Sequence, residues 1–375
     1  MPSATCSACA RRRPPRRRKP HDPPSSSGAR EALQAAARER ILLTDGGWGT
    51  QIQLRKLVEA DYAGSLGLSH DQKGNNDILA LTRPDVVTAI GEAYLQAGSD
   101  IVSTNTFSAN RISQADYGAE ALVADINHQS ARLGREIADV YQERDGRRRF
   151  IAGAVGPTNK TLSLSPDVNN PGYREIDFDE LKAVYLDQVV ALAEGGADFI
   201  LIETIFDTLN AKAGIAATLE AETKVGRELP LMISMTLTDL SGRNLSGHTV
   251  EAFWYAVRHA KPLTIGLNCS FGAAQLRPHV KVLSDLADAL VMVYPNAGLP
   301  NELGEYDEMP ETTAELVREW AEHGQVNILG GCCGSTPAHI AAMAKAIEGL
   351  APRVLPEVPV RTRLAGLEPF TMAAA

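Results

Sequence analysis

The chain has 375 residues, of which 44% are hydrophobic and 22% charged, a composition typical of a globular protein with a large core. It has no run of about 18 apolar residues and no apolar stretch behind its basic N-terminus, which argues against a membrane span and a secretory signal. Five cysteines in such a chain indicate a reducing compartment, so we expect a cytoplasmic protein.

The first 28 residues are rich in Arg, Pro and Ser and hold seven Arg or Lys against one acid. They lack the apolar periodicity that a packed element needs, so we predict a disordered tail over 1–28. The formal net charge of the chain is -9, and removing the +6 of the tail leaves -15 for the remainder. A folded part this acidic gives no indication of a nucleic-acid site.

From residue 41 onward, short runs rich in Val and Ile alternate with longer segments of helical periodicity, the pattern of repeated βα units. The predicted strands cover 41–47, 99–107, 150–158, 198–207, 229–237, 263–270, 289–298 and 326–334. Helices are predicted over 178–194 and after Thr336 and Pro337, which supply an N-cap and a first helical position. Eight such units predict an α/β protein, a single-domain (β/α)8 TIM barrel over 29–352.

An open doubly wound sheet is the alternative fold. Its dinucleotide-binding form needs G-x-G-x-x-G after the first strand, and "DGGWGTQ" does not supply that spacing. The barrel is therefore preferred.

In such a barrel, polar residues at the ends of the strands face one rim, where these folds place their chemistry. The rim residues predicted from the strand ends are Asp45, Thr104, Asn105, Thr158, Glu203, Thr236, Cys269, Asn296, Cys332 and Cys333. The sixth and eighth strands lie two apart around the barrel. The thiol of Cys269 is therefore expected to approach those of Cys332 and Cys333.

Three converging thiols have three interpretations. A disulfide is disfavoured in a reducing compartment, and adjacent cysteines close only a strained ring. Inert core cysteines are common, but the glycines that flank Cys332 and Cys333 leave little side chain for a core. Zinc is the better explanation, because three thiolates with one open position are typical of a catalytic zinc site. Such a site would hold a substrate thiol as a nucleophilic thiolate, so we predict alkyl transfer to sulfur.

Long motifs in a fixed order carry a specific resemblance to a known family between about Arg40 and Phe370. They include "DGGWGTQIQ", "KGNNDILALTRPDVV", "GGADFILIETIFDTLNAKA", "GLNCSFG", "PNAGLPNELGEYDE" and "GGCCGSTPAHI". The chain resembles the homocysteine S-methyltransferase domain family, and most closely the N-terminal homocysteine-binding module of cobalamin-dependent methionine synthase. The resemblance implies a (β/α)8 barrel whose zinc is held by Cys269, Cys332 and Cys333.

The same resemblance implies that Asp45 of "DGG" and Glu203 of "IET" receive the amino group of homocysteine. An ammonium group at a barrel rim does need acidic partners. Asn105 and Asn296 are expected only to shape the rim.

The chain departs from the family at two places. Gly47 and Trp48 stand where members often have Ala-Met, and Ser103 stands where many have Glu. We expect these departures to leave the zinc ligands untouched and to alter the loop that covers the amino-acid end of the substrate.

By resemblance, the expected reaction is methyl transfer to the thiol of homocysteine, giving methionine. Methylcobalamin would be supplied by a separate chain or module that carries folate and cobalamin domains. The family's multidomain enzyme continues through such domains, and residues 353–375, with several prolines and weak periodicity, are predicted to be a linker-like segment.

Two alternatives stay open. The first is a cobalamin-independent homocysteine S-methyltransferase that uses betaine or S-methylmethionine; the "KGNNDIL" and "GEYD" segments argue against it. The second is a non-catalytic or Schiff-base barrel. A strand-end lysine would mark the Schiff-base class, and no predicted strand ends in one.

Overall fold

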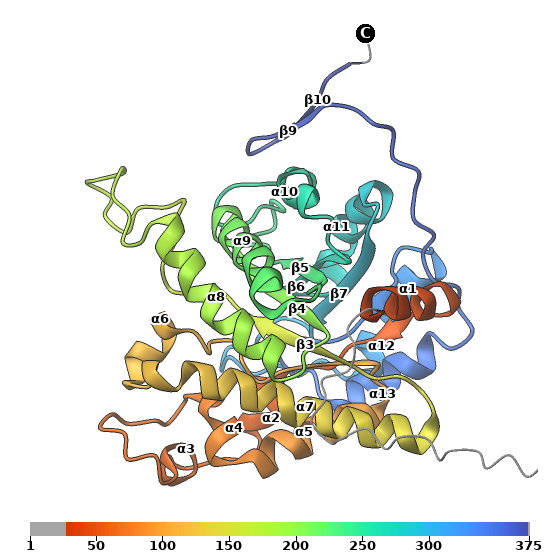
Figure 1. Cartoon of the computed structure of the whole chain (residues 1–375). Coiled ribbons are helices and arrows are strands. Elements are labelled where there is room, and N and C mark those ends of the chain that lie inside the picture. The colour runs from red at the N-terminus through yellow and green to blue at the C-terminus, as the bar shows by residue number, and fades with distance from the viewer. Residues whose placement is uncertain (1–27, 374–375) are drawn as a thin grey trace, which may run out of the picture.

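The structure is a computed structural model that describes residues 28–373, so all but the last residue of the predicted tail lies outside it. All eight predicted strands are present, and they form one parallel sheet in the order β1-β8-β7-β6-β5-β4-β3-β2. The (β/α)8 TIM barrel is therefore confirmed (Figure 1). The strands are β1 (Leu42–Leu43), β2 (Ile101–Ser103), β3 (Phe150–Val155), β4 (Phe199–Ile205), β5 (Leu231–Met235), β6 (Thr264–Gly272), β7 (Leu290–Asn296) and β8 (Ile328–Leu329).

Helices follow the strands and surround the sheet (Figure 1). The α-helices are α1 (Ala29–Glu39), α2 (Trp48–Gln53), α3 (Glu59–Ala63), α4 (Leu79–Thr82), α5 (Pro84–Ala97), α6 (Arg111–Gln114), α7 (Val123–Asp145), α8 (Phe178–Glu194), α9 (Thr208–Val225), α10 (Val250–Val257), α11 (Ala273–Leu286), α12 (Pro310–Glu322) and α13 (Pro337–Ala346). The short 3-10 helices are η1 (Asn76–Ile78), η2 (Ala115–Tyr117), η3 (Glu120–Leu122) and η4 (Arg258–Ala260). Within residues 28–373, no helix combines the length and the apolarity needed to cross a membrane.

Helix α8 has the bounds that its apolar spacing predicts. It begins after Asp177, whose carboxylate accepts the backbone N–H of Glu180 at 2.8 Å and so satisfies one free donor of the first turn. Helix α13 begins at Pro337 after the N-cap Thr336, also as predicted.

The barrel closes between β1 and β2 through one buried acid. The backbone N–H of Asp100 donates to the carbonyl of Leu43 at 2.7 Å, and the Asp100 carboxylate accepts the N–H of Leu43 at 3.0 Å. Arg40 and Arg147 form ion pairs with the same carboxylate. A charged buried group is tolerated here because both its charge and its hydrogen bonds are satisfied.

The barrel interior is filled at its amino-terminal end, which α1 covers. The side chains of Leu33 and Ala37 on α1 are buried against the first inward-facing residues of the strands. These strand residues include Leu42, Ile101, Phe150, Phe199, Leu290 and Ile328. Apolar packing fills this end, so the open end of the barrel is the one at which the strands finish.

The segment predicted to be linker-like carries an antiparallel hairpin of β9 (Arg363–Ala365) and β10 (Pro369–Thr371). The hairpin lies beside α10, outside the ring of helices (Figure 1). The N–H of Thr249, at the start of α10, donates to the carbonyl of Leu367 at 3.1 Å, and Arg243 pairs with Glu368. Residues 363–371 are thus attached to the barrel wall.

Candidate functional site

A cavity of about 670 Å³ lies where the strands end. Its wall is built by the loops that follow several different strands, so residues far apart in the sequence meet there. Every residue predicted to bind metal or substrate lines it, namely Asp45, Glu203, Cys269, Cys332 and Cys333.

The other predicted rim residues divide into two groups. Thr104, Asn105 and Thr158 line the cavity, as the positions of their strands imply. Thr236 and Asn296 are buried outside its lining. Position at a strand end therefore selects the right rim but does not decide which side chains reach the cavity.

Cys332 and Cys333 lie in the tight turn that follows β8. The N–H of Cys333 donates to the side-chain oxygen of Asn296 at 3.1 Å, so Asn296 fixes the turn from behind. A Cβ on Gly331 would lie 2.2 Å from Oγ of Ser335, a distance that no side chain permits. A residue with a side chain would not fit at position 331, beside the cysteine pair.

Cys269 lies at a β-bulge in β6. The backbone is left-handed at Cys269 (φ 61°) and Ser270 (φ 58°), and the register with β7 shifts between Asn268 and Gly272. Successive side chains of a regular strand point to opposite faces, and the bulge removes this alternation. Asn268 pairs with the inward-facing Tyr294, so regular alternation already directs it into the barrel, and the bulge turns the next residue, Cys269, inward as well. Nδ2 of Asn268 lies 3.8 Å from Sγ of Cys332. Sequence reasoning missed Asn268, whose only signal was its place before Cys269.

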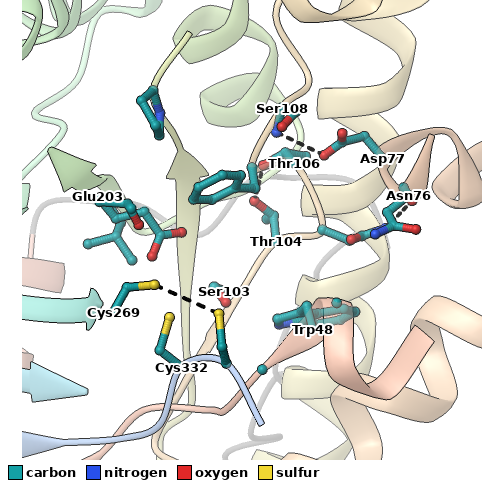
Figure 2. Close-up of a pocket in the computed structure, with 18 of the residues that line it drawn as sticks. Trp48, Asn76, Asp77, Ser103, Thr104, Thr106, Ser108, Glu203, Cys269 and Cys332 are labelled. Carbon is teal, nitrogen blue, oxygen red and sulfur yellow. Dashed lines mark hydrogen bonds between the residues drawn. The ribbon is translucent and has the colours of Figure 1, made fainter. Parts of the chain in front are cut away.

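The three sulfur atoms meet in one cluster (Figure 2). Sγ of Cys269 lies 3.7 Å from Sγ of Cys333, and all three lie within 4.8 Å of one another as free thiols. Two sulfurs bound at about 2.3 Å to one tetrahedral zinc lie roughly 3.8 Å apart. Hydrogen bonds from Cys269 and Cys332 lower the pKa of Cys333, while the bond with Cys269 raises the pKa of Cys332. The donor set and its spacing thus fit a zinc ion.

Asp45, buried after β1, is surrounded by hydrogen-bond donors. Its Oδ2 accepts from Nε1 of Trp48 (2.8 Å) and from the N–H (2.7 Å) and hydroxyl (2.8 Å) of Ser103. Among the described residues, Oδ1 accepts only from the hydroxyl of Thr44, at 3.2 Å. Burial raises the pKa of Asp45, and the bonds from Trp48 and Ser103 oppose that rise. Oδ1 is the oxygen left for a ligand.

Trp48 and Ser103 are among the three residues, with Gly47, that are expected to depart from the family pattern. Both are expected to alter a loop over the substrate. Each also donates a direct hydrogen bond to Asp45, so both act on this carboxylate.

Glu203, at the end of β4, has fewer partners than Asp45. Its Oε2 accepts from the hydroxyl of Tyr294 at 3.2 Å. Burial raises the pKa of Glu203 to about 8, and the negative charge of Asp45 adds to the rise. A cationic group bound beside both carboxylates would relieve their repulsion and restore the charged form of Glu203.

Asp77 is a cavity residue that sequence reasoning missed. It lies in η1, away from any strand end, and rim residues were predicted from the strand ends alone. It is 5% exposed, its Oδ1 accepts the N–H of Ser108 at 3.1 Å, and burial raises its pKa to about 7. Figure 2 shows Asp77 and Ser108 across the cavity from Cys269 and Cys332.

The cavity is acidic as a whole, and we call it the acidic cavity. Four carboxylates line it, those of Asp45, Asp77, Asp116 and Glu203. None of the described residues in its lining is Lys, Arg or His. Its potential therefore favours cations, and a ligand carboxylate bound there must use neutral hydrogen-bond donors.

Comparisons with known proteins give a consistent result. The sequence model of the family described as homocysteine S-methyltransferase matches residues 42–347. The metallated form of the homocysteine methyltransferase MmuM from Escherichia coli superposes with a TM-score of 0.65 at 22% identity, covering 84% of this chain and 99% of that one. Its oxidised form gives 0.64 at 22% identity, covering 81% and 95%. At this identity the structural likeness establishes the shared fold.

Proposed function

The chain belongs to the homocysteine S-methyltransferase enzyme family, and from that premise we propose that Cys269, Cys332 and Cys333 hold zinc and that the methyl group comes from methylcobalamin on a separate chain or module. The observation that carries the zinc assignment is the approach of three free thiols within 4.8 Å. The motifs that resemble the homocysteine module of methionine synthase support this donor. Since the family consists of methyltransferases, the non-catalytic and Schiff-base alternatives are dropped.

Zinc bound by three thiolates would keep a fourth, exchangeable thiol deprotonated at neutral pH. The chain's own part is to hold the ligands at the right spacing before the substrate arrives. The turn after β8 and the bulge in β6 do this with backbone geometry, and Asn268 donates to Cys332 at 3.8 Å. Such outer hydrogen bonds orient metal ligands and tune their basicity.

Glu203 and Asp45 would receive the ammonium group of homocysteine. Glu203 has one side-chain partner, Tyr294, and Asp45 keeps Oδ1 nearly free, so both can accept from an ammonium. Charge-assisted bonds of this kind contribute about 1.5 to 3 kcal/mol each. Because homocysteine is short, binding its ammonium group to these carboxylates also fixes the position of its sulfur. The sulfur is then oriented for attack on the methyl group.

In the methyl transfer, the homocysteine sulfur forms a bond to the methyl carbon while the bond between that carbon and the donor breaks, its electrons leaving with the donor. The test is to load the full chain with zinc, add homocysteine and one donor at a time, and measure methionine. We expect slow turnover with methylcobalamin, because a free cofactor lacks the effective concentration of a docked one. Methyltetrahydrofolate alone should give none. Turnover with betaine or S-methylmethionine but none with methylcobalamin would contradict the proposal.

A second candidate donor is favoured by one observation, the charge of the acidic cavity. Betaine and S-methylmethionine carry the methyl group on a cationic centre, and four carboxylates without a cation in the described lining would attract such a centre. Asp77 lies across the cavity from the cysteines, where a donor would approach (Figure 2). If this donor is correct, Asp77→Asn should raise KM for the donor and leave KM for homocysteine unchanged.

A further inference from the structure

A second cavity, of about 620 Å³, lies at the opposite end of the barrel. Pro262, shortly before β6, and Ala289, just before β7, are in its wall, which places it at the amino-terminal ends of the strands. We call it the basic cavity. Its cationic or ionisable basic lining residues are Arg30, Arg258, His259, Lys261, Arg361 and Arg363.

Three segments far apart in the sequence build the basic cavity. Arg30 comes from α1, Lys261 from the turn after η4, and Arg361 from the strand-free segment before β9. The only acidic residue in its described lining is Asp288. Cations from separate elements thus converge on one cavity in a chain whose net charge is -9.

Some of these cations are already neutralised and some are not. Arg258 binds Asp288 through its Nε at 3.0 Å, and Arg30 binds Glu228 at 2.6 Å. Lys261 and Arg361 make no ion pair or side-chain hydrogen bond with any residue in 28–373. The cavity therefore keeps uncompensated positive charge.

A third cavity, of about 860 Å³, shows what a structural cluster of cations looks like in the same protein. It is also lined by arginines, but Arg40 and Arg147 both bind the buried Asp100 that closes the barrel. Glu39 and Glu348 add negative charge to its wall. The basic cavity has no such buried acid in its described lining, where Asp288 pairs with Arg258 and is partly exposed.

Two donors in the wall of the basic cavity also lack acceptors. Nε1 of Trp254, a side chain that is 1% exposed, and Nε of Arg363 have no hydrogen-bond partner within the described chain. The guanidinium of Arg363 stands over the ring of Tyr255 at 5.4 Å, which holds it in place. Buried donors without acceptors are rare, and an acceptor-only ligand would satisfy groups of this kind.

From these contacts we propose that the basic cavity binds a small anion with phosphoryl groups, of the size of pyrophosphate or a nucleotide. Guanidinium forks match phosphate oxygens in geometry, and an ammonium adds a point charge. The volume exceeds that of one phosphate and suits a ligand with two or more charged groups. The ligand would bind about one barrel length from the cysteines, so its site is distinct from the methyl-transfer site.

The test is calorimetric titration of the full chain with pyrophosphate, ATP and citrate in turn. Pyrophosphate or ATP should bind at one site per chain, more tightly than citrate by at least tenfold. The double variant Lys261→Asn and Arg361→Gln should weaken that binding at least tenfold. Asn suits position 261 because the backbone there is left-handed, with φ 47°. The experiment needs neither homocysteine nor a methyl donor, so its result is independent of the proposed function.

The matched control is the double variant Lys224→Ala and Lys281→Ala, which removes two charges from exposed ion pairs elsewhere on the surface. It should bind pyrophosphate as the parent chain does. Equal affinity for citrate would overturn the assignment to phosphoryl groups. No binding of pyrophosphate or ATP, or equal loss of binding in both double variants, would overturn the site itself. Unchanged circular dichroism of the variants shows that they fold.

Discussion

The two ends of this barrel carry opposite chemistry. Where the strands finish, four carboxylates and three thiols line one cavity, with no Lys, Arg or His in the part of the lining that the structure describes. Where the strands start, arginines and a lysine converge on another, with Asp288 as their acid. Because salt screens exposed charges beyond about 8 to 10 Å, each cavity selects ligands by its own local charge. The same barrel thus has a cavity whose charge favours cations at one end and a cavity whose charge favours anions at the other.

The two cavities also differ in how their charged groups are held. Asp45 in the acidic cavity accepts three hydrogen bonds on one oxygen and keeps the other for a ligand. Lys261 and Arg361 in the basic cavity have no side-chain partner among residues 28–373. The acidic cavity is therefore pre-organised, whereas the basic cavity would gain order from its ligand.

Replacing one of the three cysteines of the acidic cavity should have the largest effect. Cys269→Ser, Cys332→Ser or Cys333→Ser should each lower zinc retention and reduce methionine formation by roughly 100-fold or more, since losing an outer partner alone costs about 10- to 100-fold. Metal analysis and a methionine assay check this. Ser335→Ala, which removes a hydrogen bond to the carbonyl of Cys332 but no thiol, should keep its zinc. Full zinc and full activity in any one cysteine variant would remove that residue from the ligand set.

The next largest effects are expected at Glu203 and Asp45, the two carboxylates proposed to bind the ammonium group, and they should differ in size. Glu203→Gln should raise the dissociation constant of homocysteine by about 10- to 150-fold, the loss of 1.5 to 3 kcal/mol. Asp45→Asn should have the smaller effect, because most of its acceptor capacity is already used by Trp48 and Ser103. Calorimetry on the zinc-loaded proteins measures both. Asp116 is an exposed carboxylate of the same cavity and serves as the control. If Asp116→Asn lowers homocysteine affinity as much as Glu203→Gln does, the ligand is held only by the general negative charge of the acidic cavity.

The pH dependence of stability should report on Asp77, because burial raises the pKa of this carboxyl group from 3.8 to about 7. A carboxyl group with a raised pKa binds its proton more tightly in the folded state, so stability falls as pH rises from about 4 to about 7. The slope for one proton is about 1.4 kcal/mol per pH unit. Asp77→Asn should remove this loss while keeping the acceptor for the N–H of Ser108. Denaturant unfolding of both proteins at several pH values in that range measures this. If the free energy of unfolding falls equally with pH in both proteins, Asp77 does not cause the fall.

The smallest expected effect concerns the departures from the family. Trp48→Phe removes one hydrogen bond to Asp45, a loss of about 0.5 to 1.5 kcal/mol. Because that bond opposes the raised pKa of Asp45, the pKa should rise further. Homocysteine binding should weaken two- to tenfold, and the weakening should become smaller as pH rises. A weakening that does not change with pH would mean that Trp48 acts by packing instead.

The fold was predictable because its signals are local. Buried parallel strands are short runs of Val and Ile, and helices such as α8 and α13 repeat apolar residues and carry their own caps. The rule that active sites lie where the strands end then placed Asp45, Glu203 and the three cysteines on one rim, and all five line the cavity.

Other features were hidden because they depend on tertiary geometry. The bulge in β6 turns Cys269 into the barrel directly after the inward-facing Asn268, which breaks the expected alternation of the strand. Asp77 lies between regular elements, so no periodic pattern marks it. The basic cavity joins Arg30 to Arg361, and nothing in the local sequence says that those segments meet.

The cysteine site is proposed to take up homocysteine as a thiolate. Calorimetry of the zinc-loaded chain, in buffers of different ionisation enthalpy, counts the protons released on binding homocysteine and on binding methionine. Methionine has the same ammonium and carboxylate but no thiol, so protons released by Glu203 cancel in the difference. Homocysteine should release about one proton more than methionine. Equal proton release for the two ligands would contradict it.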